Sequence, residues 1–222
     1  MINVGRRTIC AAVLAVVACG CSDSSAKDEG DGVQASKMCA GALDAPAATA
    51  LERISGTDRF EELTGTNDSG EPNRFSVSRT VKHLHDELTS RSSCSVYKAG
   101  DNSGKPVLDI DFSASQSHPE GTESPKSVKA TVTYPLGVYA VTTANGAQLF
   151  FRCTTKASSA DAYVGDAKYV MAEMYSMTGD VRGGDESKDR MTVLNSVARA
   201  VAKEAGCTRE AALPNTVPAP AR

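Results

Sequence analysis

Hydrophobic and polar residues alternate with two different periods along this chain, and each period predicts a different kind of element. Over 186–206, apolar residues recur every three or four positions, which predicts an amphipathic helix. Gly206 follows the last apolar position and is suited to end that helix. Its buried stripe is expected to be Met191, Leu194, Ala198, Val201 and Ala205.

Two shorter helices are predicted in the N-terminal half. Asp44 can cap a helix that has Pro46 in its first turn and ends at Gly56. A second helix is predicted over 76–91, with Ser76 as its cap. The apolar residues of this second helix are spaced by four, three and four: Val77, Val81, Leu84 and Leu88.

The middle of the chain has the period of two that is typical of strands. Strands are predicted over 94–98, 106–113, 127–135, 138–155 and 167–176. Within 138–155, Asn145-Gly146 separates two apolar runs, which predicts a hairpin of two strands. Short links between consecutive strands favour an antiparallel sheet of five to six strands. The predicted fold class is α+β, with the two N-terminal helices and the long C-terminal helix packed on one face.

The N-terminus has the pattern of an export signal. Arg6 and Arg7 form a basic head, Ile9 to Ala18 is almost wholly apolar, and small residues follow. The apolar run is about half of the roughly 20 residues that a membrane-spanning helix needs. The pattern therefore predicts a signal peptide rather than a membrane-spanning segment.

A lipid anchor is expected just after this signal. Val16-Val17-Ala18-Cys19 resembles a bacterial lipobox, in which the cysteine is lipidated and becomes the new N-terminus. Ala18-Cys19-Gly20-Cys21 is a poorer match, so Cys19 is the expected lipidation site and Cys21 the alternative. Lipidation at Cys21 would leave no spare thiol, whereas lipidation at Cys19 leaves Cys21 free on the tether. The resemblance implies a location on the outer face of the cell membrane, with the membrane as partner through this lipid.

Composition divides the chain into four parts. Residues 1–18 are the expected lipoprotein signal peptide, and 19–37 are rich in Ser, Asp and Gly and are expected to form a flexible tether. Residues 38–212 are expected to form one disulfide-bonded domain, followed by a disordered tail over 213–222. Removal of 1–18 takes away two arginines and no acids, so the net charge moves from −3 to −5. This charge argues against binding to nucleic acid or to anionic lipid.

Four further cysteines are spread over the expected domain: Cys39, Cys94, Cys153 and Cys207. An even number of well-spaced cysteines in an exported chain indicates disulfides, and four cysteines allow three pairings. The sequence alone does not choose between these pairings; we favour Cys39–Cys94 with Cys153–Cys207, each of which closes a loop of about 55 residues worth about 4 kcal/mol. Zinc is the competing interpretation, but no two of the four have Cys-x-x-Cys spacing.

Candidate catalytic and metal-binding residues are few. His83 and His85 are two apart, about 200° around a helix, so they cannot grip one metal together. His83 and Glu87 could supply two ligands, but nothing nearby supplies a third, and His118 lies in a Ser/Pro/Gly-rich loop.

Asp109 and Asp111 lie on the polar side of a predicted strand. Such a pair could form a two-carboxylate site, although an exposed sheet face uses aspartates more often. DNSG at Asp101 and NDSG at Asn67 lack the rest of a calcium-loop pattern and are expected to be turns. No G-x-S-x-G, phosphate-binding or dinucleotide motif is present, and the one S-x-x-K match noted, Ser24 to Lys27, lies in the expected tether where no rigid partner can orient it. No catalytic residue, metal or cofactor is therefore assigned.

The layout as a whole resembles that of uncharacterised secreted lipoproteins of actinobacteria. The resemblance rests on the lipobox, CAGALDAPAATALERISGTDRF, SSCSV, LFFRC and MTVLNSVARAVAKEAGC. It implies an extracytoplasmic, lipid-anchored domain and carries no site residue. The expected function is a binding or interaction module of the cell envelope, whose small ligand or protein partner the sequence does not identify. The alternatives are an envelope or extracellular hydrolase, and an accessory subunit of a transporter or sensor kinase.

Overall fold

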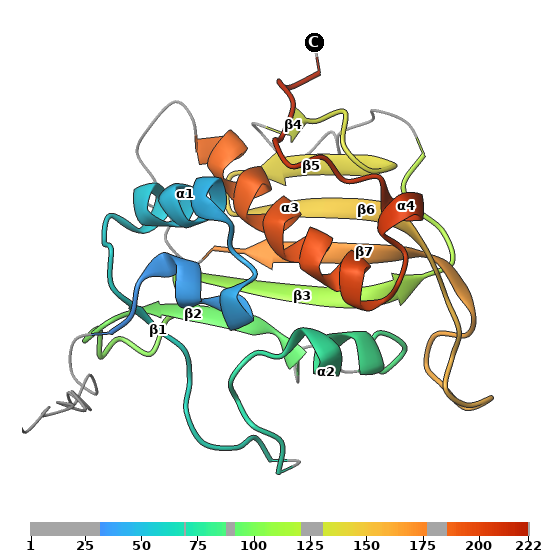
Figure 1. Cartoon of the computed structure of the whole chain (residues 1–222), viewed down its shortest axis with the longest axis horizontal. Helices are drawn as coiled ribbons and strands as arrows, with labels where there is room; N and C mark the ends of the chain where they lie inside the picture. Colours follow the sequence, from blue (N-terminus) through green and yellow to red (C-terminus); the bar gives the residue numbers. More distant parts are fainter. Residues whose placement is uncertain (1–31, 69, 88–91, 121–130, 177–185, 222) are drawn as a thin grey trace, which may run out of the picture.

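A seven-stranded antiparallel sheet forms the centre of the protein in a computed structural model, which describes residues 32–68, 70–87, 92–120, 131–176 and 186–221 (Figure 1). The strand order is β1-β2-β3-β7-β6-β5-β4. The strands are β1 (Phe60–Glu61), β2 (Cys94–Lys98), β3 (Leu108–Ser115), β4 (Val132–Thr133), β5 (Tyr139–Thr143), β6 (Gly146–Thr155) and β7 (Ala167–Tyr175). The predicted α+β class and antiparallel pairing are confirmed, with more strands than the five to six expected.

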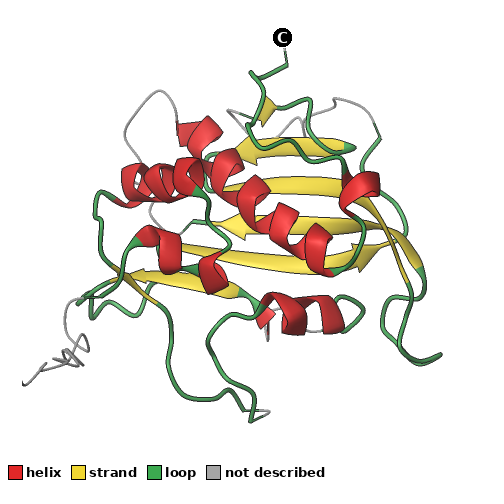
Figure 2. Ribbon diagram, in the orientation of Figure 1, coloured by secondary structure: helices red, strands yellow, loops and turns green. Residues whose placement is uncertain are grey.

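Helices cover one face of this sheet (Figure 2). Helix α3 (Glu186–Glu204) crosses the central strands diagonally, and α1 (Ala45–Ser55) packs beside it. Helix α2 (Val77–Lys82) lies near the C-terminal half of α3, and α4 (Thr208–Ala211) contacts β6. Two short 3-10 turns, η1 (Ala35–Lys37) and η2 (Cys39–Gly41), precede α1. Within the described part of the chain, no helix is both long and apolar enough to cross a membrane.

The local signals for α1 act as the sequence predicts. The Asp44 side chain accepts a hydrogen bond from the Ala47 backbone N–H at 3.0 Å, and Pro46 occupies the first turn. Gly56 ends the helix with φ of 68°, a left-handed conformation that glycine adopts without steric cost. The predicted C-terminal helix is also confirmed, and its apolar stripe is buried against the sheet.

Helix α2 is much shorter than the helix predicted over 76–91. Ser76 caps it, but the helix ends at Lys82, and 88–91 lie outside the described residues. The backbone carbonyls of Leu84 and His85 instead accept hydrogen bonds from Ala114 N (2.7 Å) and Val164 N (3.1 Å). These long-range bonds satisfy backbone groups that a continued helix would have used, and Leu84 is still buried.

The hairpin turn lies one residue earlier than predicted. Strand β5 ends at Thr143 and β6 begins at Gly146, so the two-residue loop is Ala144-Asn145 rather than Asn145-Gly146. A Cβ on Gly146 would lie 2.4 Å from the carbonyl oxygen of Met174 on β7. Glycine is therefore required here for close strand packing, not for a turn.

Strand β1 was not predicted, and β4 is shorter than expected. Phe60 pairs with Lys98 of β2, and on its other side it exchanges backbone hydrogen bonds of 2.7 and 2.8 Å with Val33. Of the strand predicted over 127–135, the structure shows only Val132–Thr133 as paired, and 127–130 lie outside the described residues. The prediction of a tether over 19–37 was therefore wrong for its last residues: Val33 pairs with the β1 edge of the sheet, Ala35–Lys37 forms a 3-10 turn and Ala35 is buried.

Both favoured disulfides are formed. Cys39–Cys94 ties the turn before α1 to β2, and Cys153–Cys207 ties β6 to the start of α4. All four cysteines are buried in the core between the sheet and the helices. The largest side chains of that core include Phe60, Phe112, Phe151, Met191 and Leu194.

The C-terminal segment is ordered, whereas the sequence predicted a disordered tail over 213–222. Val217 is buried, and the carbonyl of Pro214 accepts a hydrogen bond from the Asn195 side chain at 2.9 Å. The Ala221 backbone N–H donates to the carbonyl of Thr133 in β4 at 2.8 Å. The prediction from Pro- and Ala-rich composition was wrong because this segment packs on surface provided by α3 and β4. Figure 1 shows it running from α4 across the helical layer to the β4 edge.

Candidate functional site

The sheet face opposite the helices carries the acidic residues that the sequence singled out. Alternation along β3 places Leu108, Ile110 and Phe112 in the core, so Asp109 and Asp111 point to the other face. Antiparallel register then sets Asp111 opposite Glu173 of β7, and Glu173 opposite Gln148 of β6. Three central strands therefore contribute one polar row to this face.

This row contains an unusual carboxyl group. Partial burial of Asp111, followed by repulsion from Asp109 and Glu173, raises the pKa of that carboxyl from 3.8 to about 6. Its Oδ1 is buried and has no hydrogen-bond partner within the described residues. Like charges directly opposite each other on paired strands also destabilise a sheet. The fold therefore holds a carboxylate in an unfavourable place, which is more typical of functional sites than of structural ones.

The neighbours of Asp111 offset little of the cost of its negative charge. The Gln148 side-chain amide donates to the Glu173 carboxylate at 3.3 Å, which orients Glu173 but leaves Asp111 unaided. Ser95 of β2 lies opposite Asp109 in the register. Burial, and then repulsion from Asp109, raise the pKa of Tyr97 on β2, so this phenol is held in its neutral form. The face thus offers two aspartates, one glutamate and a neutral phenol.

A shallow pocket adjoins the row. Its volume is about 250 Å³, and Gln148 and Glu173 form part of its lining. Tyr139, Val141 and Tyr175 supply aromatic and apolar surface, and Tyr175 is half exposed. Carboxylates beside aromatic rings suit a ligand with a positively charged group on an apolar body.

The sequence found two of these residues and missed a third. Asp109 and Asp111 share a face, as predicted. Glu173 was not singled out, although its place between Ala172 and Met174 in an alternating strand was a signal that it faces away from the core. Its position opposite Asp111 depends on strand order, which alternation does not give.

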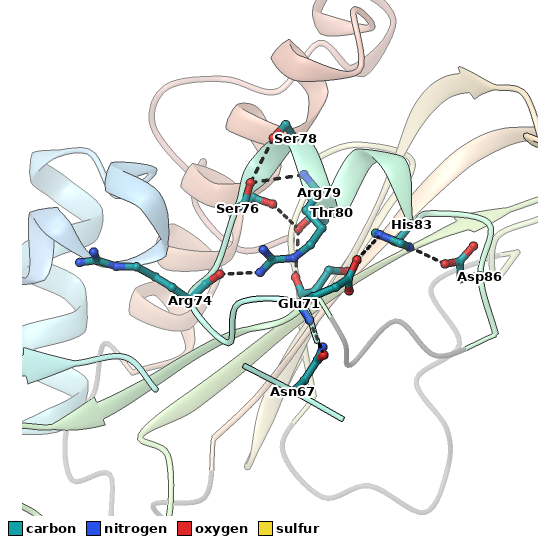
Figure 3. A network of polar contacts seen from close by, with 10 residues as sticks. Asn67, Glu71, Arg74, Ser76, Ser78, Arg79, Thr80, His83 and Asp86 are labelled. Atoms are coloured by element: carbon teal, nitrogen blue, oxygen red, sulfur yellow. Dashed lines mark hydrogen bonds and ion pairs between the residues drawn. The ribbon is translucent and has the colours of Figure 1, made fainter. Parts of the chain in front are cut away.

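The three histidines lie in separate environments. His83 Nδ1 contacts the Asp86 carboxylate at 2.5 Å and its Nε2 lies 3.3 Å from Glu71, so the ring joins α2 to the loop before it (Figure 3). The sequence offered His83 and Glu87 as two possible metal ligands without a third; in the structure the His83 ring contacts Asp86 and Glu71. Figure 3 also shows the Arg79 guanidinium donating to the carbonyl of Arg74 in that loop. This network anchors the loop.

The other two histidines contact neighbouring residues of the fold, one through a polar contact and one through its ring. Nδ1 of the buried His85 lies 2.8 Å from the Val164 carbonyl, and the His118 ring stacks edge-on against Tyr169 at 4.8 Å. Asp101 and Asn67 form turns, as predicted, by accepting backbone hydrogen bonds from Ser103 and Glu71. Among the described residues, no group of three His, Cys, Asp or Glu side chains is arranged to hold a metal ion.

Comparison with family models, with curated proteins and with solved structures finds no match to this chain. The predicted lipidation sites Cys19 and Cys21 lie outside the described residues.

Proposed function

We propose that this protein is a lipid-anchored, extracytoplasmic binding module, attached through Cys19, or alternatively Cys21, to the outer face of the cell membrane. The signal and lipobox patterns in the first 21 residues support the anchor. The two disulfides are consistent with an oxidising compartment outside the cytoplasm.

The tether sets how far the domain can sit from the membrane. Twelve residues lie between Cys19 and Gly32, where the described chain begins. Such a segment spans at most about 45 Å when extended, and about 20 Å on average if it behaves as a Gly/Ser-rich chain. Since Val33 pairs with β1, the β1 edge would be nearest the membrane. A partner in the envelope would have to come within this distance.

The binding surface in this proposal is the open face of the sheet, and its expected ligand group is a cation. The observation that carries this is Asp111, a partly buried carboxyl with raised pKa and an unpartnered oxygen, next to Asp109 and Glu173. A bound ammonium or guanidinium group would relieve the repulsion between these carboxylates. The pocket beside Glu173 would hold the apolar part of the ligand.

Two measurements test the proposal separately. Intact mass of the processed N-terminal peptide tests the anchor: a diacylglyceryl group on Cys19 is expected, and an unlipidated peptide contradicts it. Amide-shift titration with cationic probes (spermidine and a lysine-rich peptide) tests the surface. We expect shifts on β3, β6 and β7 that weaken in Asp111→Asn and persist in Asp161→Asn, a control in an exposed loop. If neither the cations nor any component of envelope extracts binds to the protein, the proposed binding role is wrong.

A hydrolase is the second candidate, because a carboxyl with pKa of about 6 can donate or accept a proton near neutral pH. Asp111 would then be the general acid or base and Asp109 its charged neighbour. Activity screening on envelope polymers, followed by Asp109→Asn and Asp111→Asn, tests this role. Turnover that is unchanged in both variants would exclude these residues from catalysis.

A further inference from the structure

A second pocket lies on the other side of the protein, in the helical layer. Its volume is about 400 Å³, within the range of small-molecule sites. It lies among the segment before α1, α3, α4 and the C-terminal segment, and Figure 1 shows α3 between the first of these and α4. No residue of the open sheet face contributes to it.

The polar wall of this pocket is tied together by Arg199 on α3. Its guanidinium donates to the Asp44 carboxylate and to the Asn215 side chain in the C-terminal segment. Nearby, the Ser196 hydroxyl donates to the Ala42 carbonyl at 2.8 Å and accepts from the Asp44 backbone N–H at 3.0 Å. These bonds fix the shape of the pocket without a ligand.

One positive group remains available toward the pocket. The Arg199 guanidinium is engaged by Asp44 and Asn215, and its Nε is buried away from solvent. Lys203 follows Arg199 by four positions on α3, so it lies on the same side, and it makes no ion pair within the described chain. Asp44 is the one acid in the lining, and it is already engaged by Arg199 and by the N-terminus of α1. The lining therefore carries one net positive charge.

The remaining wall is apolar. Small aliphatic side chains line it on three sides: Ala42, Ala200, Ala211 and Leu213. A ligand that matches both walls has one negative charge and a short apolar body. We propose that this pocket binds small amphiphilic monoanions, specifically alkyl or aryl carboxylates, with the carboxylate held by Lys203.

Titration of the full protein with octanoate, followed by ¹H–¹⁵N NMR, tests the proposal. We expect saturable one-to-one binding with a Kd on the order of 1 mM, the affinity typical of about ten heavy atoms. The backbone amides of the residues that line the pocket, Lys203 among them, should shift. Lys203→Met should weaken binding about five-fold through loss of the charge-assisted contact. Octylamine, which has the same chain and the opposite charge, should bind at least ten-fold more weakly.

Two further variants locate the site. Ala200→Leu fills the pocket from α3 and should abolish saturable binding. Lys188→Met removes an exposed lysine elsewhere on α3 and should leave the Kd unchanged. Thermal unfolding of each variant shows whether it is folded; Lys203 is exposed, so Lys203→Met remains informative if Ala200→Leu fails to fold. The proposal is overturned if octanoate does not saturate, if Lys203→Met binds equally well, or if octylamine binds as tightly as octanoate.

Discussion

Asp111→Asn is expected to stabilise this protein near neutral pH, although it removes a charged residue from a strand. The asparagine has nearly the same size but cannot ionise. It therefore removes the cost of burying a charge beside Asp109 and Glu173. Most substitutions of partly buried residues destabilise, so the predicted sign is distinctive.

The magnitude follows from the pKa of the Asp111 carboxyl, which folding raises from 3.8 to about 6. At 1.36 kcal/mol for each pH unit between these values, ionisation in the folded state costs about 3 kcal/mol. The side chain keeps some solvent contact, and screening reduces the expected gain to about 2 kcal/mol. Because folding raises the pKa, the folded chain holds this proton more tightly than the unfolded chain. The penalty is therefore absent below pH 3.8, grows as the pH rises and is complete above pH 6.

Urea unfolding at pH 4.0 and pH 7.5 measures this effect, since urea does not screen charges as a salt would. We expect Asp111→Asn to be about 2 kcal/mol more stable than the wild type at pH 7.5 and within about 0.5 kcal/mol of it at pH 4.0. Asp161→Asn, in an exposed loop, should show no such pH-dependent difference. A variant that is less stable at pH 7.5, or equally stabilised at both pH values, would refute the burial of Asp111 as described.

Two further predictions concern the framework of the fold. Gly146→Ala should lower the free energy of unfolding by about 1–3 kcal/mol, because its Cβ would meet the Met174 carbonyl oxygen. Gly165→Ala is the matched control, since its Cβ would make an ordinary 3.5 Å contact with Gln116, and equal losses in both variants would contradict the close-packing argument. The double variant Cys153→Ser with Cys207→Ser should lose about 4 kcal/mol in urea unfolding, as expected for a loop of about 55 residues. A loss below about 1 kcal/mol would show that this disulfide does not constrain the unfolded chain.

The candidate sheet-face site was only partly predictable. Alternation along one strand identified Asp109 and Asp111 as residues that share a face. It could not show that Glu173, more than sixty positions later, lies directly opposite Asp111, because strand order is not encoded in local periodicity. The raised pKa of Asp111 depends on this juxtaposition and on burial, and both are properties of the assembled sheet.

The sequence by itself determined the elements whose signals are local. Capping at Asp44, the αL stop at Gly56, the apolar stripe of α3 and the alternating strands all act within a few residues. The sequence also indicated that the four cysteines form disulfides, but it left three pairings open, and the fold selects Cys39–Cys94 and Cys153–Cys207 by bringing each pair together in the core.

Only the tertiary structure determines where contacts with residues far away in the sequence override weak local signals for helix, strand or disorder. Helix α2 stops early because β3 and the loop before β7 supply hydrogen bonds to the carbonyls of Leu84 and His85. The C-terminal segment is ordered because Asn195 and Thr133 bind its backbone, and β1 forms because β2 and Val33 pair with it. In each case the stabilising groups lie far away along the chain. Their free energy is gained only after the sheet and α3 have brought them together.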